Sequence, residues 1–202
     1  RLLGFVFACI LSSSVGVISA PFLYVLGAHG YTNYLVGKTM AVVGPLVTGI
    51  RVNLVGKANL KKENPCVYVC NHQSALDLIA MGHVIRPNVV VMAKSSIKYV
   101  PIMGQFMQLA RNILIDRKNR SSALEMMAQA AKYLQQNKAG LFVFPEGTRS
   151  HQKDNSMLPF KKGAFHVAVQ GEIPIVPIVV STYYPCYDEK EKILEPGVVT
   201  IK

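Results

Sequence analysis

The stretch CVYVCNHQSALD, residues 66–77, indicates how this chain folds. Its first five residues are small, β-branched or aromatic, a composition typical of a buried β-strand. His72 follows at the end of that strand, and Ser74 is placed to cap a helix whose first turn contains Asp77. A strand that leads directly into a helix is the building unit of α/β domains, whose sites lie at the carboxyl ends of the strands.

The same alternation of short apolar runs and helical segments continues on both sides of this stretch. Helices are expected at about 122–138 and 163–170, each followed by a glycine. We therefore predict an α/β fold for residues 51–202, with a mixed, mostly parallel sheet flanked by helices. The predicted strands are Arg51–Val55, Cys66–Cys70, Val89–Ala93, Ile113–Ile115, Leu141–Phe144, Ile175–Val180 and Val198–Ile201.

The first 50 residues are apolar and nearly uncharged, and Lys38 is their only charged side chain after Arg1. Residues 2–27 and 34–50 predict two apolar helices, and the first exceeds the roughly 20 residues needed to cross a bilayer. We expect residues 1–50 to form a membrane anchor, with a signal peptide as the alternative. The second helix is short and interrupted by Gly44-Pro45, so whether it spans or re-enters the membrane stays open.

The chain begins with Arg1 rather than Met and stops at Lys202 within a predicted strand. We therefore expect the natural protein to extend beyond both ends of this sequence.

Charge is concentrated in the second part of the chain. All 11 acidic residues, and all but two of the 22 Lys and Arg, lie in residues 51–202, which are therefore basic. Such a surface suits nucleic acid, a membrane surface or phosphorylated substrates, but no nucleic-acid-binding motif is present. Beside an apolar anchor, anionic lipids and phosphate-bearing substrates are the expected partners. The four cysteines have no metal-ligand spacing, so we predict neither a metal site nor a resident cofactor.

His72 and Asp77 form the candidate catalytic pair. Histidine suits general-base chemistry because its ordinary pKa lies near neutral pH, and a carboxylate on the second ring nitrogen fixes the tautomer. The alternative is structural, since an acid in the first turn of a helix is favoured by the helix dipole.

A second polar block, Phe144-Pro145-Glu146-Gly147-Thr148-Arg149-Ser150, follows the predicted strand Leu141–Phe144. Glycine lets backbone approach a ligand closely, and the planar arginine side chain matches phosphate oxygens. A Glu–Arg pair on a surface turn is the structural alternative. Lys161 and Lys162, which open the helix at Gly163, suit either a phosphate or a solvated basic face.

Together, these blocks resemble the His-x4-Asp and Glu-Gly-Thr-Arg signatures of the glycerolipid acyltransferases, and among them the lysophosphatidate acyltransferases. Two further segments resemble the family, residues 112–117 (NILIDR) and 173–179 (IPIVPIV), so the resemblance covers about residues 52–200. This sequence departs from the family pattern at Ala110, where glycine is common.

The resemblance implies transfer of an acyl group from acyl-CoA, as co-substrate, to the sn-2 hydroxyl of 1-acylglycerol-3-phosphate. It implies His72 as general base and Asp77 as its orienting partner. The implied phosphate-site residues are Arg117, Glu146, Gly147, Thr148 and Arg149. Backbone amides near the start of the helix after His72 are our expected oxyanion donors.

Two other functions stay open at this point. One is acyl transfer to another acceptor, such as glycerol-3-phosphate or a different lysophospholipid, and the other is a non-catalytic, membrane-bound lipid-binding protein. Because acyl-CoA is cytosolic, we expect the site to face the cytosol from the endoplasmic reticulum or an equivalent bacterial membrane.

Overall fold

The structure is a computed structural model that describes residues 1–61, 65–116 and 120–202. Its helices are α1 (Leu2–Val25), α2 (Thr32–Thr48), α3 (Asp77–Val84), α4 (Met103–Leu109), α5 (Arg120–Asn137) and α6 (Gly163–Gln170), with 3₁₀ turns η1 (His29–Tyr31), η2 (Lys57–Lys61) and η3 (Ser95–Tyr99). Its strands are β1 (Ile50–Leu54), β2 (Val67–Cys70), β3 (Val89–Lys94), β4 (Ile113–Ile115), β5 (Gly140–Val143), β6 (Ile175–Ile178), β7 (Tyr187–Asp188), β8 (Ile193–Leu194) and β9 (Gly197–Ile201).

A five-stranded parallel sheet in the order β4-β3-β5-β2-β6 forms the centre of the molecule. Strands β2 and β5 are buried along their whole length, as expected for a sheet covered on both faces. They pair in register from Val67 and Leu141 to Val69 and Val143, so their carboxyl ends coincide. The two polar blocks that follow these strands in sequence are therefore neighbours in space.

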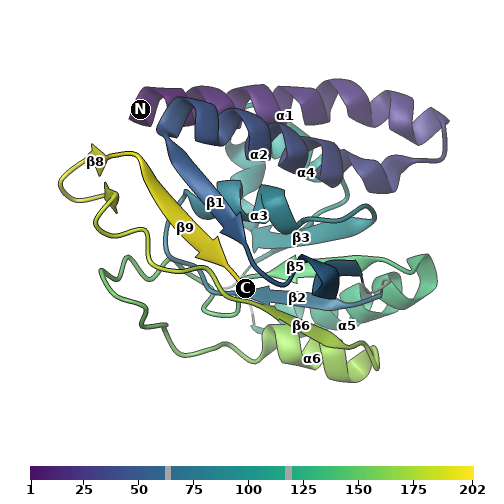
Figure 1. Cartoon of the computed structure of the whole chain (residues 1–202). Helices are drawn as coiled ribbons and strands as arrows, with labels where there is room; N and C mark the ends of the chain where they lie inside the picture. Colours follow the sequence, from purple (N-terminus) through teal and green to yellow (C-terminus); the bar gives the residue numbers. More distant parts are fainter. Residues whose placement is uncertain (62–64, 117–119) are drawn as a thin grey trace.

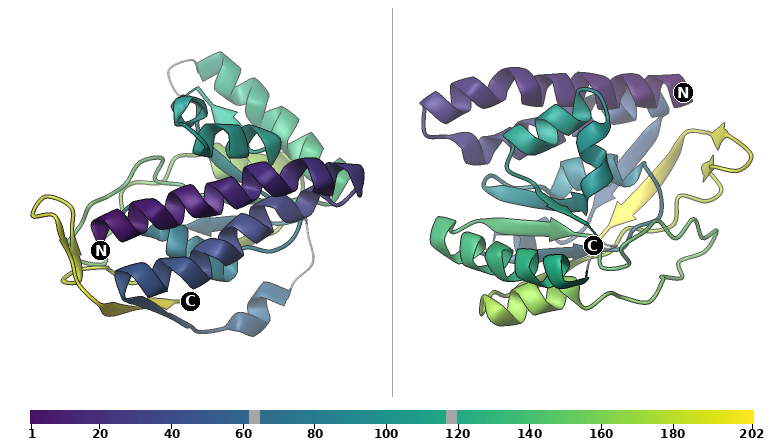
Figure 2. Two further views of the ribbon diagram at one scale, coloured as in Figure 1. Left: turned by 90° about the horizontal axis from the view of Figure 1, so that it is seen from above. Right: turned by 180° about the vertical axis from the view of Figure 1, so that it is seen from behind.

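Helices cover both faces of the sheet (Figures 1 and 2). Helices α5 and α6 lie together on one face, while α3 and α4 lie on the other with α1 and α2 stacked over them. The parallel pair β1–β9 lies beside the main sheet, and β7–β8 form a small antiparallel hairpin. The predicted fold class is confirmed, with an α/β body and an apolar N-terminal helix.

Helices α1 and α2 are built into the body through apolar packing. Phe5 and Ala8 of α1 and Met40 of α2 belong to the main hydrophobic core, together with residues of the sheet. At Gly16 the approach of α1 to α4 is close, because a Cβ there would lie 2.4 Å from Cδ2 of Phe106. Helix α2 ends at Thr48, two residues before the predicted boundary, and it packs on α3, β1 and β3 beyond that boundary.

A buried polar contact also joins α2 to the sheet. The side-chain amide of Asn33 donates to Oδ1 of Asn112 at 2.9 Å and to the Val89 carbonyl at 3.0 Å, and Asn112 donates back to Oδ1 of Asn33 at 3.0 Å. Asn112 also accepts the Val91 amide at 2.7 Å. These buried amides satisfy one another, which fixes the position of α2 on β3 and the turn before β4.

Of the described helices, α1 is the one that is long and apolar enough to cross a membrane by length and composition, with a mean hydropathy of 2.2 in its most apolar window. Both predicted N-terminal helices are present, and α2 has 17 residues. The regular turns of α3 begin at Asp77, three residues after the predicted cap at Ser74. Ser74 nevertheless makes the hydrogen bonds of a cap, since its Oγ accepts the Leu76 amide and its own amide donates to Asp77, both at 3.0 Å.

Candidate active site

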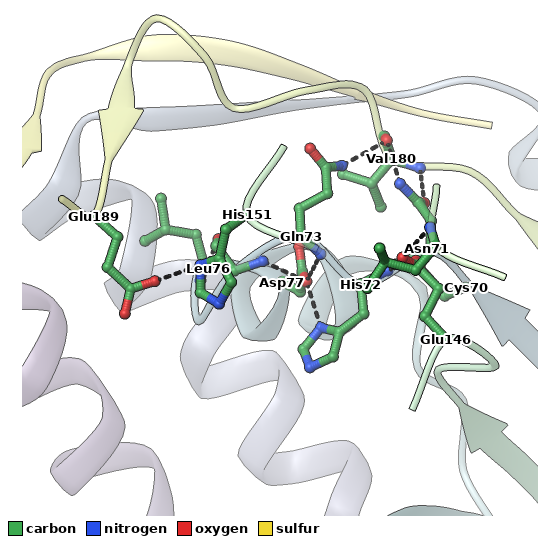
Figure 3. Close-up of polar contacts among 12 residues, drawn as sticks. Cys70, Asn71, His72, Gln73, Leu76, Asp77, Glu146, His151, Val180 and Glu189 are labelled. Atoms are coloured by element: carbon green, nitrogen blue, oxygen red, sulfur yellow. Dashed lines mark hydrogen bonds and ion pairs between the residues drawn. The ribbon is translucent and has the colours of Figure 1, made fainter. Parts of the chain in front are cut away.

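The segment after β2 is held in place by the chain that follows β6, its other neighbour in the sheet. Asn71 exchanges two hydrogen bonds with the backbone of Val180, at 2.9 and 2.8 Å. The side-chain amide of Gln73 donates to the carbonyls of Val180 and Ser181, at 2.8 and 3.0 Å. His72 lies between these two anchored residues, so its backbone has little freedom (Figure 3).

His72 and Asp77 meet as predicted from their spacing. Nδ1 of His72 lies 2.7 Å from Oδ2 of Asp77, and this oxygen also accepts the amides of Gln73 and Ser74 at 2.7 and 3.0 Å. Since a carboxylate only accepts, Nδ1 carries the proton and Nε2 keeps its lone pair. The imidazole stacks on Phe144, with ring centroids 4.0 Å apart. His72 also lines the adjoining cavity, in an orientation that suits a general base.

Glu146 joins the second block to the first. Its side chain is 1% exposed; Oε1 accepts the backbone amide of His72 at 2.6 Å, and Oε2 accepts the amide of Leu158 at 2.8 Å. The amides of Ser150 and His151 donate in turn to the carbonyls of His72 and Gln73, at 2.8 and 3.2 Å. Both carboxylate oxygens of Glu146 are therefore engaged with backbone, and the geometry gives this residue a positioning role.

Glu146→Gln should lower both stability and kcat. A glutamine side chain has one acceptor oxygen, whereas the amides of His72 and Leu158 each need one. The NH₂ group of the glutamine would therefore face a backbone N–H. We expect the free energy of unfolding to fall by about 1–3 kcal/mol, the cost of a buried unpaired donor. Thermal unfolding and initial rates would measure this, with Glu125→Gln on the exposed side of α5 as the control. Unchanged stability and kcat would contradict this role for Glu146.

The loop after Glu146 turns at a left-handed residue. Gly147 has φ of +72°, a conformation that side chains other than glycine rarely adopt. The turn directs Thr148 and Arg149 to the cavity beside His72. This accounts for the glycine in the predicted block.

Three cationic side chains line this end of the cavity: Lys94 at the end of β3, Arg149, and Lys161 before α6. All three are exposed, and within residues 1–61, 65–116 and 120–202 none forms an ion pair with a carboxylate. Free cations grouped beside a base are a suitable binding site for phosphate oxygens. Sequence analysis missed Lys94, because only the sheet order brings β3 to this edge. Arg117 lies outside the described residues, and its assignment stays a prediction.

The cavity has a volume of about 1060 Å³ and extends from His72 to the inner faces of α1 and α2. Away from the cations its wall is mostly apolar. Methionine is unusually common there, and such unbranched side chains adapt to flexible apolar ligands. The wall includes Phe5, Cys9, Val36, Met40, Leu78, Met81, Ile85, Met92, Met103, Phe106, Met107 and Met127. The N-terminal helices therefore form part of the site.

Cys70 lies near Asp77 and Glu146 but does not have the properties of a nucleophile. It is 3% exposed, and burial, followed by the nearby charges of Asp77 and Glu146, raises the pKa of its thiol well above the ordinary value. A neutral buried thiol is unreactive. Among the described residues no group of three or more His, Cys, Asp and Glu is arranged to hold a metal ion.

The expected oxyanion donors near the start of α3 are mostly occupied. The amide of His72 donates to Glu146, those of Gln73 and Ser74 donate to Asp77, and that of Leu76 donates to Oγ of Ser74. Three of these amides donate to the protein's own carboxylates and the fourth donates to a hydroxyl, so these four groups do not fit the expectation.

Comparisons with known proteins agree with this geometry. The family model described as Acyltransferase matches residues 51–181. An uncharacterised acyltransferase of Schizosaccharomyces pombe is 38% identical over 200 residues, which are 97% of this chain and 72% of that protein. The 1-acyl-sn-glycerol-3-phosphate acyltransferase of Saccharomyces cerevisiae is 38% identical over 187 residues (93% and 61%), and the human alpha form is 39% identical over 183 residues (91% and 64%).

A crystal structure of the 1-acyl-sn-glycerophosphate acyltransferase from Thermotoga maritima has the same fold, with a TM-score of 0.65 at 20% identity, covering 96% of this chain and 83% of that one. The chain therefore belongs to the acyltransferase family. Within the family it is similar to the 1-acyl-sn-glycerol-3-phosphate acyltransferases. It spans less than two thirds of the length of the Saccharomyces cerevisiae and human relatives.

Proposed function

We propose that this chain contains the catalytic machinery of a membrane-bound enzyme that transfers a fatty acyl group from acyl-CoA to the sn-2 hydroxyl of 1-acylglycerol-3-phosphate, giving phosphatidate and CoA. The observation that carries the proposal is the position of His72. Its ring is oriented by buried Asp77 and opens on a cavity with cations at one end and apolar side chains at the other. An acceptor with both a phosphate and an acyl chain fits this cavity, because its phosphate can contact the cations and its chain can contact the apolar wall.

In this reaction His72 takes the hydroxyl proton of the lysolipid at Nε2 as the oxygen attacks the thioester carbonyl carbon. Asp77 stabilises the imidazolium that forms. The C–S bond then breaks, and His72 returns the proton to the sulfur of CoA. Direct transfer is favoured over a covalent acyl-enzyme because the thiol beside the pair, Cys70, is buried and neutral.

The outer surface of the N-terminal helices supports the membrane part of the proposal. Large apolar side chains are exposed along α1 and α2, including Leu3 at 85% and Leu46 at 79%. An exposed apolar surface of this extent is typical of a contact with lipid or protein. With a lipid substrate and a cytosolic acyl donor, the proposed location is the endoplasmic reticulum membrane, with the site on its cytosolic side.

The proposal is tested by assaying the purified protein with one acyl-CoA and a panel of acceptors in mixed micelles. We expect the highest kcat/KM with 1-acylglycerol-3-phosphate, and little transfer to monoacylglycerol, which has no phosphate. Preference for glycerol-3-phosphate or lysophosphatidylcholine would change the assigned acceptor. Absence of transfer to every acceptor would contradict enzymatic function.

Arg149→Ala should act on the acceptor more than on the donor. A charge-assisted hydrogen bond contributes about 1.5–3 kcal/mol, so the KM for lysophosphatidate should rise about 10- to 100-fold. Arg149→Lys should restore part of this, because a point charge cannot form the bidentate contact. Arg86→Ala, an exposed cation outside the cavity lining, is the matched control. An equal loss with an acceptor that lacks phosphate would assign Arg149 to CoA or to the fold.

A further inference from the structure

The two oxygens of the Asp77 carboxylate have different surroundings. Oδ2 accepts three hydrogen bonds, from His72, Gln73 and Ser74. Oδ1 is buried and accepts no hydrogen bond of standard geometry from a described residue. A buried acceptor without a donor destabilises the folded state, so a donor close to Oδ1 is expected.

Tyr183 is the side chain placed to supply that donor. It is 4% exposed, and its hydroxyl is likewise buried without a hydrogen bond of standard geometry among the described residues. Asp77 is nevertheless close enough to this hydroxyl to interact with it. Burial, followed by the charge of Asp77, raises the pKa of Tyr183 well above the ordinary value, so the phenol keeps its proton and is a donor.

The path of the chain explains how Tyr183 reaches Asp77. Asn71 and Gln73 hold the backbone of Val180 and Ser181 against the segment that contains His72. Tyr183 follows two residues after Ser181, and its side chain is buried. The same contacts that fix His72 therefore also fix the phenol relative to the carboxylate.

We propose that Tyr183 is a positioning residue for acyl transfer: its hydroxyl donates to Oδ1 of Asp77 and holds the carboxylate in the rotation that presents Oδ2 to His72. This proposal rests on the proposed function. It adds a third member to the His72–Asp77 pair, one that contacts neither substrate nor the reacting atoms. Without the phenol, the carboxylate would be held through Oδ2 alone, and the imidazolium would be less well stabilised.

Tyr183→Phe removes the hydroxyl and leaves the ring in the core. We expect kcat to fall about 10-fold or more, the loss of a hydrogen bond to a charged group, while the KM for both substrates stays unchanged. Tyr68→Phe is the matched control, because Tyr68 is also buried but its hydroxyl lies near Cys66 and Arg86. An equal fall in kcat for both variants, or a rise in KM without a fall in kcat, would overturn the proposal.

A double-mutant cycle separates positioning from general stability. If Tyr183 acts through Asp77, Asp77→Asn and the double variant Asp77→Asn/Tyr183→Phe should have the same kcat. If the two losses multiply, Tyr183 acts independently of Asp77 and the proposal is overturned. Wild type and His72→Ala are measured alongside. An inactive wild type would refute the proposed function, whereas an active wild type with a Tyr183→Phe variant of equal kcat refutes only this inference.

Proton NMR supplies a readout that needs no substrate. The His72 Nδ1 proton, bonded to a buried carboxylate, should resonate far downfield in the wild type and shift in Tyr183→Phe but not in Tyr68→Phe. If Tyr183→Phe does not fold, the Tyr183 hydroxyl proton of the wild type is measured instead. This proton should exchange slowly with water and should shift upfield in Asp77→Asn. A hydroxyl proton that does not respond to Asp77→Asn would overturn the proposal.

Discussion

His72→Ala is expected to lower kcat for acyl transfer by about 10²–10⁴-fold, the contribution of a positioned general base, or more. Neither neighbour of the ring replaces the lost Nε2, since Cys70 is a buried neutral thiol and Asp77 is bonded to Nδ1 on the other side of the ring. The fold should survive. Asp77 would still accept the amides of Gln73 and Ser74, and Glu146 bonds to the backbone of residue 72 and not to its side chain.

Initial rates and thermal unfolding of His72→Ala and His166→Ala would separate these effects. His166 is exposed on α6 and does not line the cavity, so its variant should keep the wild-type kcat. A His72→Ala protein with near-normal kcat would refute the mechanism. A protein that loses both kcat and its cooperative unfolding would instead show that the ring is needed for the fold.

The central strands β2 and β5 were predictable because they are buried on both faces. Val67–Cys70 and Gly140–Val143 differ from their predicted bounds by one residue, since a short run of β-branched and aromatic residues has few other stable arrangements. The contact between His72 and Asp77 was predictable because the two residues are five positions apart, one just after the end of a strand and the other at the start of the next helix. The order of the strands has no comparable local signal, so the position of Lys94 beside Arg149 was not predictable.

The role of Glu146 shows a different limit. Its partners are backbone amides at His72 and Leu158, 74 and 12 residues away. Every residue except proline has such an amide, so no residue type marks the partner in the sequence. The same holds for the backbone amides that were expected to stabilise an oxyanion: those of His72, Gln73 and Ser74 donate to Glu146 and Asp77, and these contacts depend on the tertiary structure.

The division of the chain into an anchor and a catalytic domain also depended on composition alone. Apolar residues with few charges predict a membrane segment whether they face lipid or a protein core. In the structure α1 and α2 do both: one side exposes large apolar side chains, and the other contributes Phe5 and Met40 to the core and cavity wall. Removing these helices therefore tests whether they serve for more than membrane attachment.

A chain that starts at Ile50 is expected to lose all measurable transfer and to unfold without cooperativity or aggregate. The reason is structural. Without α2, the paired amide of Asn112 and the Val89 carbonyl lose the Asn33 side chain, and the apolar faces of α3 and α4 become exposed to water. Each buried polar group left unpaired costs about 1–3 kcal/mol, which is large against a total stability of about 5–15 kcal/mol.

A short-chain lysophosphatidate that dissolves as monomers does not need the enzyme to be at a bilayer. Such a substrate therefore separates the loss of the folded site from the loss of membrane attachment. We expect the full chain to acylate it and the shortened chain to be inactive. Asn33→Leu in the full chain is a milder test: it keeps the helix apolar but leaves Asn112 unpaired, so the unfolding temperature should fall while membrane association persists. If the shortened chain unfolds cooperatively and acylates the soluble substrate at the full rate, α1 and α2 serve only to attach the enzyme to the membrane.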